Sequence, residues 1–393
     1  MTETESIPVA RLVEPLTVVI TTHNQVGALR RHLPAFLSQD YDLYEVIVVD
    51  IGSTDETLPW LKAMELEYTN LRHLSTPASA RDISLERLGL TLGIRTAGSK
   101  WVVLSEANCE PASNRWLSLL AEQLHRHTEA DIVMGFSRYQ ERHHGWFDHK
   151  IGFYRLWHHL ANYRHMQSGH TAVRGDGCNM AIRKSLFMDK GGFAATQNLR
   201  RGACDLLVNQ LSTPANTALC LDPQAAVVQD KPTHQQWQQE RMFYVETRRH
   251  QQHTWLYRTR NNLNLLWPWF EALCMAVPFL TGIVMLVLSL QRADATYLHP
   301  WHLWHHSLLP ASPTAPATTE IVIFSLFLLA LLAAMVLISS VRIRQFNNSA
   351  RALGCRTYRL TFIVFELCMP FWAAAAWLRH RLASKNEFRK QFV

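Results

Sequence analysis

The stretch that decides the fold runs from Glu45 to Asp55 and reads EVIVVDIGSTD. Four apolar residues lead to Asp50, and a small, turn-forming Gly-Ser-Thr run follows before Asp55. A continuous apolar run is typical of a buried parallel strand, and open α/β sheets bind nucleotides at the carboxyl ends of such strands. The stretch therefore predicts a strand that delivers a carboxylate to a binding edge.

A second stretch of the same design lies upstream, at Leu16–Gln25, and reads LTVVITTHNQ. It predicts an apolar strand, then polar groups, then an amphipathic helix. The expected elements that follow are strands near 71–74 and 101–104 and helices at 84–97 and 116–127. Thr54 is expected to cap a further helix that runs to about Met64. Strands that alternate with helices predict a mostly parallel sheet covered on both faces.

Composition limits the classes of protein to which the chain can belong. With 393 residues it can hold one large domain and something smaller, and its formal charge of +7 would suit nucleic acid or an anionic membrane. Much of the positive charge borders apolar segments, which favours membrane lipids and argues against nucleic acid. The seven cysteines include no Cys-x-x-Cys pair, which fits a reducing compartment and argues against a structural zinc site.

Long apolar segments appear after residue 263. Residues 272–290 and 321–341 contain no charged side chain, and each segment is long enough to cross a bilayer. A third segment, at 360–378, is interrupted by Glu366 and Pro370. We therefore expect a flexible N-terminus at 1–14, a domain at 15–250 and a membrane region at 251–393.

The positions of the cations predict the orientation of these segments. Arginines precede the first segment and fill residues 342–359, whereas Arg292 is the only lysine or arginine at 291–320. By the positive-inside rule, the first domain and residues 342–359 are cytoplasmic. The tail after residue 378 is also basic, so we expect 360–378 to be a broken or re-entrant segment that returns to the same face. The N-terminus has neither a basic start nor an apolar core, so no signal peptide is expected.

Together, the motifs over residues 14–250 resemble the inverting family 2 glycosyltransferases of the GT-A fold. In that family, a strand ends near Pro-Thr-Tyr-Asn-Glu, and Val-Val-Asp-Asp-Gly-Ser-Thr-Asp follows. Residues 175–184 read GDGCNMAIRK and residues 191–193 read GGF, similar to a later element of the family. The resemblance implies an α/β fold: a Rossmann-like nucleotide-diphospho-sugar transferase (GT-A) domain, followed by a C-terminal α-helical membrane region.

The resemblance also implies a nucleotide-sugar donor and the residues that bind it. These donor-binding residues are Thr21, His23, Asn24, Asp50 and Arg87. Ile51 departs from the family because a second Asp is usual there, and Gln25 replaces the usual Glu. Two simpler roles stay open, since Asn24 would also serve as a helix cap and Arg87 as a surface charge.

The family's metal motif is altered in this chain. Where the family has Asp-x-Asp for Mg²⁺ or Mn²⁺, the sequence has Glu106-Ala107-Asn108. Carboxylate and amide oxygens suit such hard cations, but one negative charge is lost, so binding should be weaker unless Glu110 helps. A solvent-facing turn is the alternative for this segment.

The acceptor side of the expected site is also incomplete. Anchoring the family's acidic cluster on Asp205-Leu206 puts Ala203 where the usual base stands, so Asp205 is the remaining candidate base. Asn179 is implied on the acceptor side. Gln238 and Arg241 resemble a Gln-x-x-Arg-Trp element that binds the diphosphate, with Met242 in place of Trp. Polar positions on an exposed helix are the alternative for this last pair.

The resemblance and the apolar segments imply a multi-pass protein of the inner, cytoplasmic membrane. Its catalytic domain would be cytoplasmic and would move a sugar to a lipid-linked or glycan acceptor in envelope glycan synthesis. The alternative is a catalytically degenerate, glycosyltransferase-like protein that acts as a binding or partner subunit. Ile51, Asn108, Ala203 and Cys204 favour that alternative.

Overall fold

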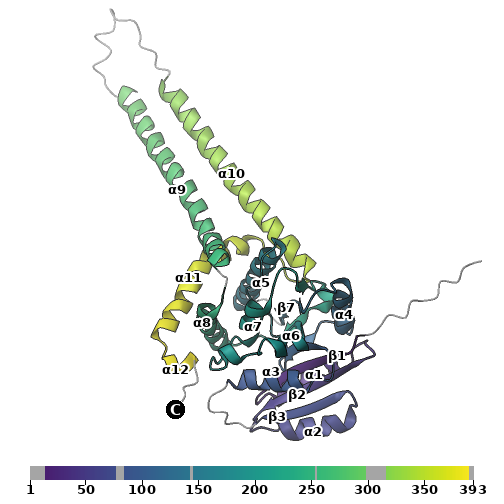
Figure 1. The fold of residues 1–393 in the computed structure, drawn as a ribbon. Coiled ribbons are helices and arrows are strands. Elements are labelled where there is room, and N and C mark those ends of the chain that lie inside the picture. Colours follow the sequence, from purple (N-terminus) through teal and green to yellow (C-terminus); the bar gives the residue numbers. More distant parts are fainter. Residues whose placement is uncertain (1–13, 77–83, 142–144, 253–254, 298–315, 389–393) are drawn as a thin grey trace, which may run out of the picture. The chain divides into compact units, whose positions relative to one another are not determined.

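The computed structural model describes residues 14–76, 84–141, 145–252, 255–297 and 316–388 (Figure 1). The flexible N-terminus predicted at 1–14 lies outside these residues except for Glu14. The chain divides into two compact units. Unit 1 comprises Met1–Thr259, Ser349–Thr357 and Phe371–Val393, and unit 2 comprises Arg260–Asn348 and Tyr358–Pro370. The predicted ranges 15–250 and 251–393 stay predictions.

Unit 1 is built around a seven-stranded sheet. In spatial order its described strands are β3 (Leu71–Thr76), β2 (Tyr44–Ile51), β1 (Leu16–Thr22), β4 (Trp101–Glu106), β8 (Met180–Arg183), β6 (Ile132–Met134) and β9 (Thr217–Leu219). All neighbouring pairs are parallel except the two that involve β8. The predicted mostly parallel α/β sheet is confirmed.

The register of the central strands brings polar residues to one edge. Thr22 of β1 lies opposite Asp50 of β2, and Thr21 lies opposite Glu106 of β4. Because parallel strands end at the same edge of a sheet, three of the side chains chosen from the sequence meet there.

Helices cover both faces of the central strands. α1 (Val26–Leu37) packs Leu33 and Phe36 into the same core as Val18 of β1. On the opposite face, α3 (Leu85–Thr96) approaches so closely that a Cβ on Gly93 would lie 2.4 Å from Cγ1 of Val19. Only glycine fits this contact.

The remaining helices and strands of unit 1 surround this sheet. They are α2 (Thr57–Glu67), α4 (Trp116–Arg126), α5 (Trp146–Gln167), α6 (Lys184–Asp189), α7 (Ala203–Leu211), α8 (His234–His250), α12 (Lys385–Phe388) and a small sheet of β5 (Cys109–Pro111), β10 (Val227–Gln229) and β7 (Ser137–Tyr139). The helix expected after Thr54 begins later, because Oδ1 of Asn24 accepts the backbone N–H groups of Thr54 and Asp55.

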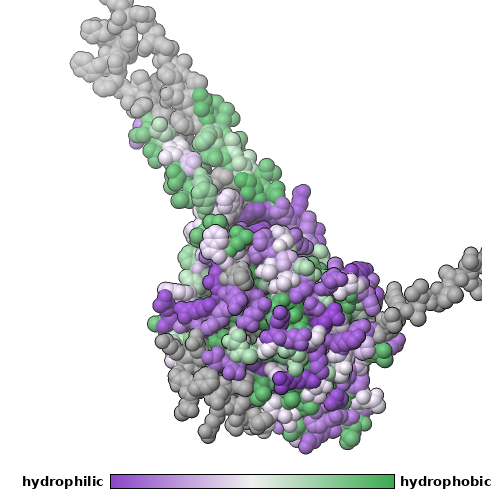
Figure 2. All heavy atoms as spheres, viewed as in Figure 1, coloured by the Kyte–Doolittle hydropathy of each residue, from purple (hydrophilic) through white to green (hydrophobic). Residues whose placement is uncertain are grey.

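Three described helices are long and apolar enough to cross a membrane, judged by length and composition. They are α9 (Trp255–Tyr297), α10 (Pro316–Ala352) and α11 (Leu360–Leu382). Figure 2 shows hydrophobic residues along the outside of α9 and α10. Leu273 and Leu329 are 62% and 63% exposed, an exposure that suits contact with lipid rather than water.

The helix α11 differs from the broken segment predicted at 360–378. It runs without interruption through Pro370. Proline removes one backbone N–H, so it frees only the carbonyl of Glu366 four residues earlier. The side chain of Glu366 accepts a hydrogen bond from Arg342 of α10, and Arg342 also pairs with Glu271 of α9 at 2.5 Å. This pairing compensates the charges inside apolar helices.

The segments on both sides of α11 contact the domain that holds the sheet. Before α11, Arg138 donates to the carbonyl of Gly354. In the second half of α11, the carbonyl of Trp372 accepts from Arg241 of α8, and His380 lies 2.8 Å from the carboxylate of Glu246. Although burial opposes ionisation, hydrogen bonds from His380 and His250 lower the pKa of Glu246.

Candidate active site

A cleft of about 660 Å³ opens in unit 1 at the carboxyl ends of β1 and β4. Five of the site residues chosen from the sequence line it: Thr21, Glu106, Asn108, Asp205 and Arg241. The others do not line it: His23, Asn24, Asp50, Arg87, Asn179 and Gln238. Segments that lie far apart in the sequence, from β1 to α8, therefore form one concave site.

Three predicted donor-binding residues form a turn cluster beside this cleft. Asp50 is buried, and its carboxylate accepts the backbone N–H of Ser53 at 3.2 Å. His23 lies 2.7 Å from the carbonyl of Ile51 through its Nδ1 atom. Asn24 adopts φ of +53° and accepts the N–H of Thr54 at 2.7 Å. These bonds join the ends of β1 and β2, while the side chains of His23 and Asn24 remain exposed.

Arg87 lies in the interior of the domain, which the sequence did not predict. Its side chain is buried, and its guanidinium donates to the carbonyls of Leu199 and Arg201 and to the hydroxyl of Thr196. Burial lowers the pKa of Arg87. The guanidinium is thus occupied by the segment 196–201, which leads into α7. We assign Arg87 to positioning that segment rather than to touching a donor.

Asn179 has a similar internal role. Its amide is fully buried: it accepts from the indole Nε1 of Trp116 at 3.0 Å and donates to the carbonyls of Phe136 and Ala225. A Cβ on Gly135 would lie 2.4 Å from this amide, which explains the glycine there. Asn179 therefore anchors the end of the loop before β8. The residue before it in that loop, Cys178, lines the cleft.

Glu106 stands at the position of the first carboxylate in the family's Asp-x-Asp metal motif. Enclosure in the cleft raises its pKa to about 7, and Glu86 adds to that rise. Gln229 donates to its Oε2 at 3.2 Å. A cation would relieve this cost of burying charge, and Asn108 offers an amide oxygen close by in the same cleft. One carboxylate and one amide suit Mg²⁺ or Mn²⁺ when diphosphate oxygens complete the shell.

Glu110 does not join these oxygen ligands. Its carboxylate lies 2.8 Å from Nδ1 of His32 on α1, and Glu110 is not among the residues that line the cleft. Of the two glutamates near the altered metal motif, Glu106 lines the cleft and Glu110 does not.

Asp205 lies in the first turn of α7 and faces the cleft. Nε of Arg174 donates to its Oδ1 at 3.5 Å. Burial raises the pKa of Asp205, and Arg174 opposes that rise. The buried Ala203 precedes it by two residues. A carboxylate that is mostly buried, faces a cleft and has a raised pKa has the properties of a general base.

Arg241 and Gln238 point in different directions from α8. Arg241 is buried against the cleft, with its guanidinium 4.5 Å from the ring centre of Trp237 and 5.0 Å from that of Tyr154. Gln238 instead pairs with His234 at 2.9 Å on the outer side of the helix. Only the arginine of this predicted pair lies at the cleft.

The cleft also contains a buried polar cluster that sequence reasoning missed. Arg155 of α5 donates to Ser137, lies 3.8 Å from Asp176 and lines the cleft together with His159. Burial lowers the pKa of His159 to about 3, so its ring is neutral. Asp176 belongs to the GDGCNMAIRK stretch, which was the only signal; nothing in the sequence marks Arg155.

Comparisons with known proteins agree with this fold. Residues 17–189 match the model of glycosyl transferase family 2. Mannosyltransferase PcManGT from Pyrobaculum calidifontis, solved with GDP-Man and Mn²⁺, is 16% identical with a TM-score of 0.55, over 94% of this chain and 87% of that one. No curated protein matches the sequence.

A second similar structure is S. aureus TarS 1–349 in complex with UDP-GlcNAc. It is 14% identical with a TM-score of 0.42, over 56% of this chain and 60% of that chain, so the match spans less than two thirds of TarS. At such identities, likeness is limited to the fold. Residues 17–189 are thus similar to family 2 glycosyltransferases, and the parallel sheet with a cleft at its carboxyl edge has the GT-A fold.

Proposed function

We propose that this protein transfers a sugar, with inversion, from a nucleotide-diphosphate donor to a lipid-linked acceptor at the cytoplasmic face of the inner membrane, in envelope glycan synthesis. One observation carries the proposal. Glu106, Asp205 and Arg241 line a single cleft in a chain that also has three apolar helices. A nucleotide-sugar site tethered beside the bilayer suits an acceptor that is itself held in the bilayer.

Each residue in the cleft has a task in this reaction. Asp205 takes the proton of the acceptor hydroxyl, whose oxygen bonds to the anomeric carbon as the bond to the diphosphate oxygen breaks. A divalent cation held by Glu106 and Asn108 would neutralise the departing diphosphate. Arg241 adds a fixed positive charge beside it. The nucleoside diphosphate leaves, and the proton remains on Asp205.

Nucleotide release tests this activity. The protein purified in detergent, with Mn²⁺, a lipid acceptor and a panel of UDP- and GDP-sugars, is expected to release nucleotide from one donor. Glu106→Gln should lower release by at least about tenfold, because it removes the central carboxylate. Glu110→Gln is the matched control, since Glu110 faces His32 instead of the cleft. No release from any donor with several lipid acceptors would overturn the proposal.

A non-catalytic binding or partner subunit is the second candidate. The observation in its favour is Ala203, which lines the cleft where the family's base is expected. Donor binding of ordinary affinity without turnover, unchanged by Asp205→Ala, would favour this candidate over the transferase.

The contacts around α11 support a specific membrane topology. Gly354 and Arg356 precede α11, and Trp372, His380 and Phe388 lie in its second half or beyond it. Before α11, Gly354 contacts Arg138 and Arg356 contacts Glu141. In its second half and beyond, Trp372 contacts Arg241, His380 contacts Glu246 and Phe388 contacts Arg200. A helix whose two flanks contact one domain has both flanks on that domain's side. We therefore infer that α9 and α10 cross the membrane and that α11 returns to the cytoplasmic face.

Reporters fused to the intact chain test this topology. Reporters at the N-terminus and at the C-terminus are both expected on the cytoplasmic side, and one inserted between α9 and α10 on the opposite side. A C-terminal reporter on the side opposite to the N-terminal one would show that α11 crosses the membrane.

A further inference from the structure

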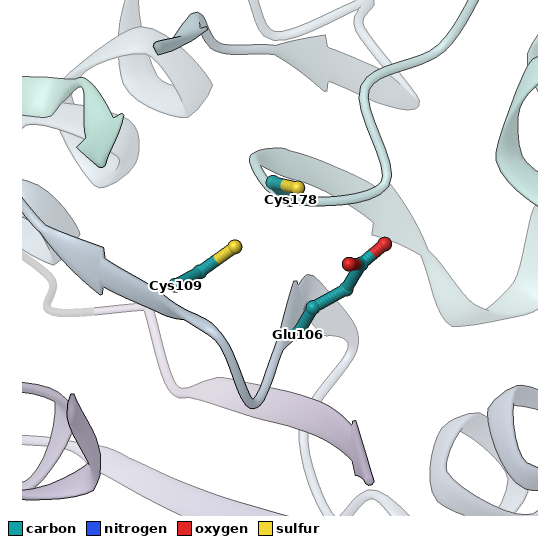
Figure 3. Close-up of side chains that lie close together, drawn as sticks. All are labelled: Glu106, Cys109 and Cys178. Carbon is teal, nitrogen blue, oxygen red and sulfur yellow. The ribbon is translucent and has the colours of Figure 1, made fainter. Parts of the chain in front are cut away.

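Two cysteines, Cys109 and Cys178, lie close to Glu106 (Figure 3). Cys109 begins β5, and Cys178 lies in the loop before β8. One ligand atom from each of the three residues lies within 4.8 Å of the others. Both thiols are buried, and Glu106 and Cys178 also line the cleft, so a small ion can reach them from solvent.

This donor set differs chemically from the oxygen ligands of a hard cation. Two sulfurs and one carboxylate suit Zn²⁺ or Cd²⁺, whereas Mg²⁺ and Mn²⁺ prefer oxygen. Zn–S distances of about 2.3 Å and Zn–O distances of about 2.0 Å imply tetrahedral ligand atoms roughly 3.5–3.8 Å apart. The three atoms, now within 4.8 Å of one another, therefore need to draw together by about 1.3 Å at most, which side-chain rotation can supply.

The neighbouring groups hold the ligands and balance their charge. Gln229 donates to Glu106 at 3.2 Å, and the hydroxyl of Ser105 donates to the carbonyl of Cys178 at 3.0 Å. Nη2 of Arg155 lies 3.8 Å from Sγ of Cys178. A divalent cation would offset most of the negative charge of two thiolates and one carboxylate, and Arg155 adds a positive charge that it shares with Asp176, 3.8 Å away.

We propose that Glu106, Cys109 and Cys178 bind a thiophilic divalent cation, Zn²⁺ or Cd²⁺, with a fourth position open to the cleft. The site goes beyond the proposed transfer reaction and does not require it. It shares Glu106 with the proposed Mg²⁺ or Mn²⁺ site, so the two ions exclude each other. The scattered cysteines of the sequence gave no sign of it, because the fold brings residues 109 and 178 together.

Cadmium absorption tests the site. The reduced, metal-free full-length protein is titrated with Cd²⁺, and thiolate-to-cadmium charge transfer is followed in the ultraviolet. Cys274, Cys355 and Cys368, the cysteines outside the core, are replaced by alanine in every sample. One equivalent of Cd²⁺ should give saturable absorption, which excess Zn²⁺ lowers by competition and excess Mg²⁺ does not.

Variants make the assignment specific. Cys109→Ser and Cys178→Ser should each lose the absorption, and the matched control Cys220→Ser, another buried cysteine, should keep it. Because a serine at a core position can destabilise the domain, Glu106→Gln provides a second variant that keeps both thiols. It should weaken Cd²⁺ binding by at least about tenfold. No absorption in the parent protein, or equal absorption and affinity in all variants, would overturn the proposal whether or not the protein transfers sugar.

Discussion

Asp205→Asn is expected to lower turnover by about 10²–10⁴-fold and to leave donor affinity nearly unchanged, because it removes a positioned base without touching the donor side of the cleft. Asparagine keeps the shape of the side chain and its contact with Arg174. The measurement is kcat from nucleotide release, with the dissociation constant of the donor measured separately. Asp189→Asn, at an exposed position on α6, is the matched control.

The pH dependence gives the same variant a second readout. Burial raises the pKa of Asp205, and the base must be unprotonated to act, so turnover should fall as pH falls through that pKa. Asp205→Asn should abolish this acidic limb. Replacing Arg174 by Gln removes the cation that holds the pKa down, so the limb should move to higher pH.

A substitution at position 203 tests whether the natural site has lost catalytic power. Ala203→Asp restores a carboxylate at the family's usual base position, and a gain in activity would show that the natural site has lost catalytic power. If Asp205→Asn leaves a measurable activity untouched, the assignment of Asp205 as the base is wrong.

Arg87→Ala is expected to lower the free energy of unfolding by on the order of 3 kcal/mol, because three buried acceptors on the segment 196–201 lose their donor. Turnover should fall as well, since this segment leads into α7 and Asp205. Thermal unfolding of the purified protein measures the first effect. The matched control is Arg95→Ala, which removes an exposed arginine from the same helix.

The opposite result would restore the role that the sequence suggested for this arginine. If Arg87→Ala leaves stability unchanged but abolishes donor binding, the guanidinium contacts the donor and its internal hydrogen bonds are secondary.

The sheet and its binding edge were predictable because the signals are local. The apolar runs at β1, β2 and β4 are each followed at once by polar residues, and parallel pairing alone aligns Thr21 with Glu106. No knowledge of distant contacts was needed. The apolar helices α9 and α10 were detectable for the same reason, since length and absence of charge are properties of a single segment, whereas Glu366 and Pro370 suggested a break that α11 does not have.

The roles of buried polar side chains were not predictable in this way. Arg87 and Asn179 resemble site residues in the sequence, but their partners lie far along the chain, at residues 196–201 and at Trp116. Arg155 shows the converse case, since a single arginine within a helix carries no motif. Only the folded structure shows which polar side chain is hydrogen-bonded inside the protein and which one faces a cleft.

The contact between the C-terminal segment and α8 determines which fragments of the protein can keep the cleft intact. Arg241, a residue of the cleft wall, uses the carbonyl of Trp372 as its partner, and Trp237 packs edge-on against the ring of Trp372. A soluble fragment that ends before α9 loses both contacts along with its anchor. The second half of α11 thus also supports the wall of the cleft, so a detergent that loosens α11 is expected to disturb the cleft as well.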